Sequence, residues 1–150
     1  MSVQTVARPV SPDTGAAALA LREAIFDALC RDAALTILLG AGTKIFLGEP
    51  LIHPFPRIEI GAAKLIDFDG SDVEEHEITL HAYTRGDHRG AHMLAGALLQ
   101  ALDDVPLTIP GHRLVNFRFA VADIRREADG RTYHALVRFR AVTEPAEVVS

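Results

Sequence analysis

The chain has a single cysteine, Cys30, among its 150 residues, and this count excludes an internal disulfide. Because Cys30 lies in a helical pattern, we expect a buried, inert thiol in a protein of a reducing compartment. No apolar run approaches the roughly 18 residues of a membrane span. The first ten residues, MSVQTVARPV, lack the apolar stretch of a signal peptide. These absences predict a soluble protein that is made in the cytoplasm and has no membrane partner.

Residues for catalysis are also scarce. The few serines lie in expected loops or tails (Ser2, Ser11, Ser71 and Ser150), so a serine–histidine triad has no good nucleophile. The run 40–44 lacks the Gly-Lys-Ser/Thr order of a phosphate loop and fits the end of a helix better. We therefore predict no catalytic residue, no cofactor and no enzyme activity.

Metal-ligand patterns are incomplete. His88 and His92 are four residues apart on a predicted helix, but no third ligand has a suitable spacing, so we expect surface histidines. The segment 67–72 holds three aspartates, yet Gly70 directly follows the second of them, unlike the calcium-loop pattern. We expect a solvated acidic turn there and no metal site.

The composition suits one globular domain, because 49% of the residues are hydrophobic. We expect a flexible arm over residues 1–13, a domain over 14–145 and a short tail over 146–150. The net charge of −5 argues against a dedicated nucleic-acid binder. It agrees with a protein that nucleic acid passes without binding, because phosphate attraction would slow that passage.

Apolar periodicity predicts an α+β fold: a mostly antiparallel sheet with a long C-terminal β-hairpin and two main helices packed on one face. The main helices are expected over residues 14–30 and 87–102, with Arg22 turned outward on the first. A short helix capped by Asp32 ends before Gly40. The expected strands lie at 43–47, 57–66 and 74–84 and in the hairpin 111–145.

The hairpin is the most informative stretch of the sequence. Two rows of alternating apolar residues, one from Val115 to Val121 and one from Ala135 to Ala141, meet at a turn around Gly130. A three-residue loop, 128–130, puts both rows on one face and pairs Val121 with Val137 and Phe119 with Phe139.

This register places Arg118 opposite Arg140 on the other face, with Arg138 diagonal to them. Like charges directly opposite destabilise a strand pair by up to about 1 kcal/mol. We therefore expect an anionic group over this face, from a neighbouring strand, another subunit or nucleic acid.

Two stretches of the chain resemble the tail completion (tail-terminator) proteins of tailed phages, in particular those of prophages and gene transfer agents. The first is His76–Thr84 before a helix, and the second is Gly111–Phe119 with the hairpin that follows. The resemblance covers about residues 19–145. It implies a structural protein that forms a hexameric ring at the head-proximal end of the tail tube. Such a ring stops tube polymerisation, joins the head connector and lets double-stranded DNA pass through its centre.

A ring needs a heterologous interface, with a different surface on each side of the subunit. Our candidates are the arginines Arg118, Arg138 and Arg140 against the acids Glu74, Glu75 and Glu77. If the acids lie on a neighbouring strand of the same chain, the pairing explains only the sheet. Two loops with few apolar anchors are candidate contacts to the tail tube and the connector, through Pro50, His53, Pro54, Asp67, Asp69 and Asp72.

Two alternatives remain. One is a completion or joining protein on the head side of the same junction. The other is a small cytosolic enzyme or ligand-binding domain in which His81, His112 and His134 converge on a pocket.

Overall fold

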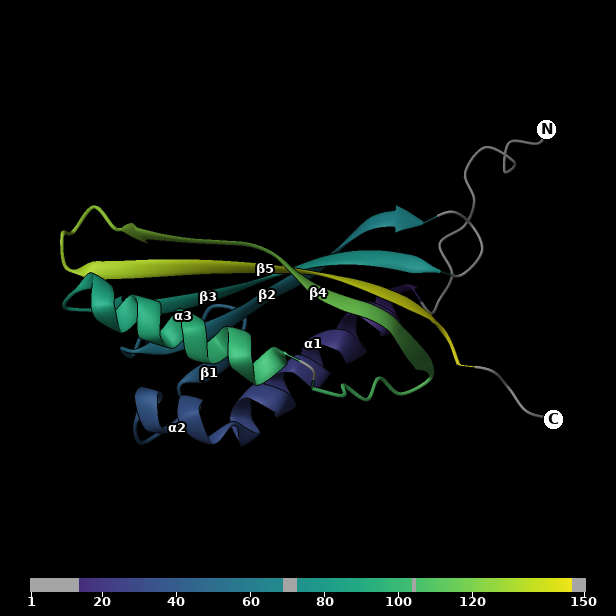
Figure 1. The fold of residues 1–150 in the computed structure, drawn as a ribbon, viewed down its shortest axis with the longest axis horizontal. Coiled ribbons are helices and arrows are strands. Elements are labelled where there is room, and N and C mark those ends of the chain that lie inside the picture. Colours follow the sequence, from purple (N-terminus) through teal and green to yellow (C-terminus); the bar gives the residue numbers. More distant parts are fainter. Residues whose placement is uncertain (1–13, 69–72, 104, 147–150) are drawn as a thin grey trace.

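Three helices lie on one face of a five-stranded sheet in the computed structural model, which describes residues 14–68, 73–103 and 105–146 (Figure 1). The elements in chain order are α1 (Thr14–Arg31), α2 (Ala33–Leu39), β1 (Ile45–Leu47), β2 (Arg57–Phe68), β3 (Glu74–Arg85), α3 (His88–Leu102), β4 (His112–Arg126) and β5 (Thr132–Pro145). The predicted α+β class is confirmed. The expected arm and most of the expected tail lie outside the described residues.

The strands are arranged in the order β1-β2-β3-β5-β4. β1 runs parallel to β2, and every other neighbouring pair is antiparallel. The two edges of the sheet are therefore β1, with 3 residues, and β4, with 15 residues. A long edge strand presents unpaired backbone groups on which a partner can align.

The helix ends follow the predicted capping. The Asp32 carboxylate accepts a 3.0 Å hydrogen bond from the third amide of α2, and Asp87 accepts one of 3.1 Å from the third amide of α3. Gly40 ends α2 with a φ of 81°, and Lys44 Nζ donates to the last carbonyl of that helix at 3.0 Å. The run 40–44 is thus a helix end, as predicted.

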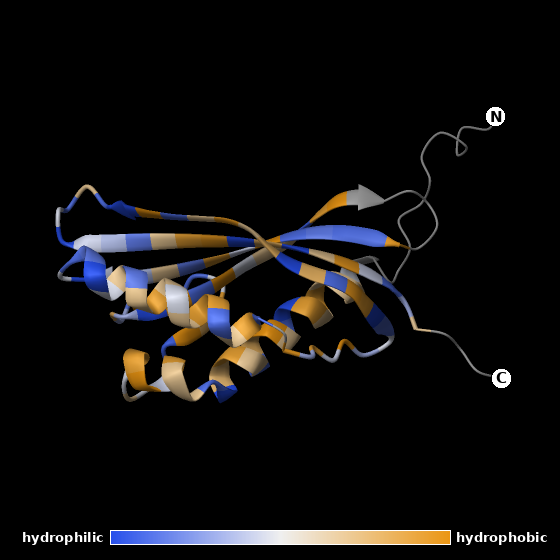
Figure 2. Cartoon of the chain, viewed as in Figure 1, coloured by the Kyte–Doolittle hydropathy of each residue, from blue (hydrophilic) through white to orange (hydrophobic). Residues whose placement is uncertain are grey.

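The core lies between the helices and the sheet. Hydrophilic and apolar bands alternate along the long strands (Figure 2), and β3 and β5 present their apolar rows to the helices. Fully burying a large aliphatic side chain contributes roughly 1.5–3 kcal/mol. On β3 and β5 the buried apolar residues are Ile78, Leu80, Ala82, Ala135, Val137, Phe139 and Ala141.

The hairpin turn is one residue longer than predicted. Gly130 has the expected positive φ, 75°, and its N–H donates to the Glu127 carbonyl. The Glu127 N–H, however, donates to the Thr132 carbonyl, which leaves residues 128–131 in the loop. The carboxylate of Asp129 accepts hydrogen bonds of 2.8 Å from the backbone N–H groups two and three residues further on, and these stabilise the longer loop.

The longer loop changes the register near the turn. Val121 pairs with Arg138, so the predicted pair with Val137 is wrong. A bulge between Phe119 and Val121 then restores the predicted register from Phe119 to Asn116. Beyond the bulge Phe119 lies opposite Phe139, and Arg118 lies opposite Arg140, as predicted.

β4 buries less than its apolar pattern suggests. A second register shift lies between Leu114 and Asn116, and each bulge reverses the side-chain alternation of the strand. Val115 and Val121 are therefore exposed, and the predicted row that places both on one face with Phe117 and Phe119 is wrong. Phe117 lies partly buried against the core.

The side chain of Arg22, predicted to face outward, reaches from α1 to the backbone of β2. Its Nε donates to the Gly61 carbonyl at 2.8 Å and its Nη2 to the Ile60 carbonyl at 3.0 Å. These carbonyls lie where the pairing of β2 with β3 shifts register. A Cβ at position 61 would come within 2.8 Å of the Thr79 carbonyl oxygen, so this close strand approach requires glycine.

Cys30, near the end of α1, is exposed, and the expectation of a buried thiol is wrong. The residue falls just outside the apolar stripe that Leu29 closes. Partial burial and, secondarily, Asp27 raise the pKa of the Cys30 thiol, which disfavours the reactive thiolate. Neither α1 nor any other helix in the described part of the chain is long and apolar enough to cross a membrane.

Candidate functional site

The sheet face turned away from the helices, here called the outer face, carries most of the predicted interface residues. All three helices lie on the opposite face (Figure 1). On β3 the odd-numbered residues from Glu75 to Tyr83 point outward and are half-buried, while the even-numbered residues are buried. The outer face is thus a polar surface supported by a rigid core.

Two of the predicted arginines pair with acids on the neighbouring strand of the same chain. Arg138 Nε lies 3.7 Å from Glu77 Oε1 and donates to Thr79 Oγ1 at 3.2 Å. Arg140 Nη1 lies 3.5 Å from Glu75 Oε2. Exposed pairs of this kind contribute about 0–1 kcal/mol each. For these two arginines the charge pattern is explained within the sheet.

Arg118 differs from the other two arginines. It lies on the edge strand opposite Arg140, so two like charges face each other across the β4–β5 pair. Among the described residues no carboxylate lies within ion-pair distance of Arg118. Its guanidinium is available to an acidic group of a partner.

The other predicted acids lie elsewhere. Glu74 points to the helix side of the sheet, where it is buried with its Oε1 3.4 Å from His76 Nε2, so it does not reach the arginines. The backbone of Asp67 pairs with Glu75 at the end of β2. Asp69 and Asp72 lie outside the described residues.

A histidine pair occupies the outer face near the hairpin turn. His81 Nδ1 lies 2.7 Å from His134 Nε2, and His134 Nδ1 lies 3.1 Å from Glu127 Oε1. The ring of Tyr83 stacks on His134 with centroids 4.4 Å apart. Burial lowers the pKa of both histidines, and the pKa of His81 is lowered further by the neighbouring His134. These shifts favour the neutral forms of both rings.

His112, the third histidine of the predicted pocket, lies far from the His81–His134 pair. His112 begins β4, pairs with Pro145 at the opposite end of the hairpin and contacts the Pro110 carbonyl at 3.1 Å. The expected convergence of His81, His112 and His134 is wrong.

The metal patterns also remain incomplete in the described residues. The rings of His88 and His92 lie 6.4 Å apart, and His88 packs on Tyr133. Within residues 14–68, 73–103 and 105–146 no group of three or more potential metal ligands is present.

The loop before β2 is anchored at one end only. The Arg57 guanidinium lies 4.1 Å from the Tyr83 ring and 4.8 Å from the Phe55 ring, and the Arg85 guanidinium lies 4.1 Å from Phe55. Arg57 Nε also donates to Glu59 at 2.6 Å in a buried pair. Phe55 therefore anchors this loop, and the prediction that the loop has few apolar anchors is corrected at this residue.

The start of the same loop projects from the molecule. Leu51 is 100% exposed and Ile52 is 81% exposed. Pro50 and Pro54 flank them, and His53 Nε2 lies 3.0 Å from Glu49 Oε2. The residues predicted from the sequence as partner contacts in this loop were its prolines and His53, and they did not include the two apolar residues. The signal was present, since two large apolar residues stand between prolines in a loop.

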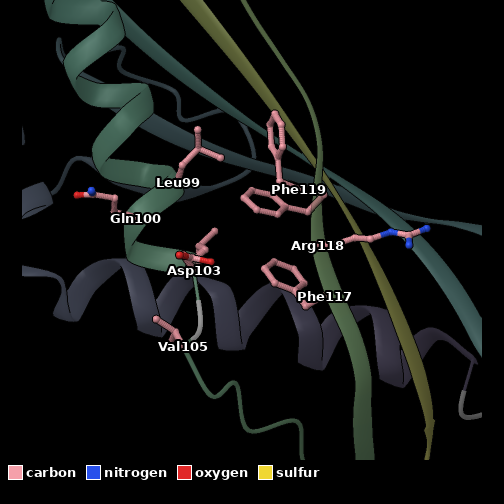
Figure 3. A pocket seen from close by; sticks show the side chains of 9 residues that line it. Leu99, Gln100, Asp103, Val105, Phe117, Arg118 and Phe119 are labelled. Carbon is pink, nitrogen blue, oxygen red and sulfur yellow. The ribbon is translucent and has the colours of Figure 1, made fainter.

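A groove along the free edge of the sheet is a second feature that the sequence analysis missed. It has a volume of about 470 Å³ and lies between the C-terminal end of α3 and β4. Phe117 and Phe119 point into it from β4, whereas Arg118 points to the other side of the strand (Figure 3). The remaining apolar lining comes from Leu99, Leu102, Val105 and Phe139.

Comparison with known proteins gives a consistent result. Residues 23–144 match the family model of tail completion protein gp17. The fold is similar to that of a chain in the virion of a native gene transfer agent particle, with 26% identity and a TM-score of 0.75 over 85% of this chain and 97% of that chain. It is also similar to the gp17 protein of bacteriophage SPP1, with 20% identity and a TM-score of 0.61 over 89% and 94% of the two chains. No curated protein matches significantly.

Proposed function

Because the chain belongs to the tail completion protein gp17 family, we propose that it is the tail terminator of a phage-like particle. In this role, copies of the chain form a ring, hexameric as the family resemblance implies, on the head-proximal end of the tail tube. The ring stops tube polymerisation and provides the surface to which the head connector binds. It is assembled in the bacterial cytoplasm and needs no catalytic group or cofactor.

The observation that carries this proposal is the likeness to a gene transfer agent virion chain over 97% of that chain. This likeness supports a structural role in a virion. Two features of the chain support a ring. The long edge strand β4 is unpaired on one side, and Arg118 has no acidic partner in the described residues. Both features suit a neighbouring subunit.

Deletion of the gene for this chain, in a bacterial strain that produces the particles, tests the proposed role. We expect tail tubes of uncontrolled length and heads without tails, because nothing ends the tube or offers a joint to the connector. Tube lengths measured by electron microscopy would give a broad distribution, and the full-length chain supplied from a plasmid would restore a single length. Finished particles of normal length without the chain would refute the proposal.

We further propose that DNA passes through the ring without stable binding. The net charge of −5 per copy gives a ring whose field opposes phosphate approach. Filter binding of purified chain to duplex DNA should give at most weak retention that salt abolishes. A complex that survives at about 0.2 M salt would overturn the idea of a passive channel.

A further inference from the structure

The chain carries an apolar projection at one side of its sheet. The loop from Glu49 to His53, here called the apolar loop, leaves β1, which is one edge of the sheet. The side chain of Leu51 is fully exposed and that of Ile52 nearly so. Neighbouring large apolar side chains with this exposure are typical of a protein contact site.

The groove beside β4, here called the edge groove, lies at the other edge of the same sheet. Six of its nine lining residues are aromatic or aliphatic, the polar ones are Gln100, Asp103 and Arg118, and Phe119 is 50% exposed at its rim. The volume of about 470 Å³ falls within the range of binding sites that hold small apolar groups. It offers room for branched side chains such as those of Leu51 and Ile52.

The charges around the two features are complementary. Arg118 lies between Phe117 and Phe119 on β4, its side chain points to the other side of the strand from the groove, and it has no acidic partner among the described residues. Glu49 begins the apolar loop, and its exposed side chain lies 3.0 Å from His53 Nε2, its one ion-pair contact among the described residues. An apolar contact flanked by one acid and one base fixes both the position and the direction of a partner.

Because β1 and β4 are opposite edges, the apolar loop and the edge groove are kept apart within one chain. We propose that the apolar loop of one copy docks into the edge groove of the next copy, with Glu49 near Arg118 of its neighbour. This inference rests on the ring of the proposed function and gives that ring its subunit contact. The contact is heterologous, with a different surface on each side, as a closed ring requires.

Disulfide cross-linking of the purified full chain tests the contact. Cys30→Ser removes the native thiol, and Leu51→Cys with Phe119→Cys then places one cysteine on each side of the contact. Oxidation should give a ladder of covalent oligomers that ends at the size of the ring, and reduction should return the monomer. Leu51→Cys or Phe119→Cys alone should give at most dimers, because each copy then has one thiol.

A substitution in the apolar loop provides an independent measurement. Leu51→Asp should weaken assembly by roughly tenfold or more, because a carboxylate would enter an apolar groove. Its melting temperature should stay that of the wild type, since the side chain is fully exposed. Ile37→Asp on α2 is the matched control, because Ile37 is also an exposed apolar residue, at 79%, and lies outside the loop. That control should assemble like the wild type.

The outcomes separate the two proposals. A ring that forms normally in Leu51→Asp, with no ladder from the double-cysteine chain, would overturn the docking contact and leave the ring intact. A wild-type chain that stays monomeric up to its solubility limit would overturn the ring as well. Covalent links from the double-cysteine chain in whole particles only to a tube or connector protein, with none between copies, would assign the loop to that partner and refute the contact between copies.

Discussion

The two strands of the C-terminal hairpin have similar apolar patterns and opposite environments. β5 lies between β3 and β4, and its alternate side chains from Tyr133 to Thr143 are buried. β4 is an edge strand with two bulges, and its side chains range from partly buried to exposed. Alternation thus predicts that a strand forms, whereas the position in the sheet decides what the strand buries. The apolar residues that β4 leaves exposed are available to a partner.

Two matched valine-to-aspartate substitutions, one on β5 and one on β4, should show the largest difference in unfolding free energy between the two strands. Val137 on β5 is fully buried, so Val137→Asp places an unpaired charge in the core and should cost more than about 4 kcal/mol of unfolding free energy. Val121→Asp on β4 should cost less than about 0.5 kcal/mol, because that residue is exposed. Urea unfolding followed by circular dichroism measures both. Similar losses would contradict the distinction between interior and edge strands.

Two glycine-to-alanine substitutions, one on β2 and one on α3, test the close packing of the interior strands. Gly61→Ala would force β2 and β3 apart at a 2.8 Å contact with backbone oxygen, at a cost of about 1–3 kcal/mol. Gly96→Ala on α3 meets no neighbour within 4 Å and should stabilise the protein by about 0.5–1 kcal/mol. Thermal unfolding of both variants gives the comparison, and a stabilising Gly61→Ala would disprove the close approach.

Acid should destabilise the interior strands through their histidines. Burial is the main cause that lowers the pKa of His76, His81 and His134 below 6.5. The unfolded chain therefore binds more protons, so this stability is present above pH 6.5 and is lost as the pH falls through the folded pKa values. Melting temperatures between pH 8 and pH 5 should decrease with acid.

The variant His81→Gln gives a control for that prediction. It removes one titrating ring from the facing pair and should reduce the loss of melting temperature on acidification. A chain whose melting temperature is the same at both ends of this range would show that the histidines titrate normally in the folded state.

Charge reversal on the two strands should have the smallest effect on stability. Arg138→Glu sets a third carboxylate beside Glu77 and should lower the unfolding free energy by about 1 kcal/mol or less. Arg118→Glu removes the repulsion from Arg140 and should leave stability unchanged or slightly higher, while weakening ring assembly. Chemical unfolding and sedimentation velocity report the two properties separately. Equal effects of both variants on assembly would remove the special role of Arg118.

Much of the fold could be predicted from the sequence because local signals were strong. The capping residues Asp32 and Asp87, the helix end at Gly40 and the strict alternation of β5 each have one physical interpretation. Three details departed from the predictions, the first through local hydrogen bonds and the second through a tertiary contact. The Asp129 carboxylate selected a longer turn, Arg22 bonded to carbonyls of β2, and Cys30 fell outside the buried stripe.

The candidate site was predictable only in part. The arginine row on the outer face followed from register, and the pairing of Arg138 and Arg140 with acids of the same chain required the strand order. The edge groove joins the end of α3 to β4, and no local pattern indicates that these segments meet. The exposure of Leu51 likewise depends on what the rest of the chain leaves uncovered.

We propose that copies of this tail completion protein assemble into a closed ring. Native mass spectrometry of the purified full chain tests it most directly, with electron microscopy of the same sample. We predict one dominant oligomer of fixed copy number and, in the images, rings with an open centre. A monomer or symmetric dimer at every concentration, or filaments of indefinite length, would contradict the claim.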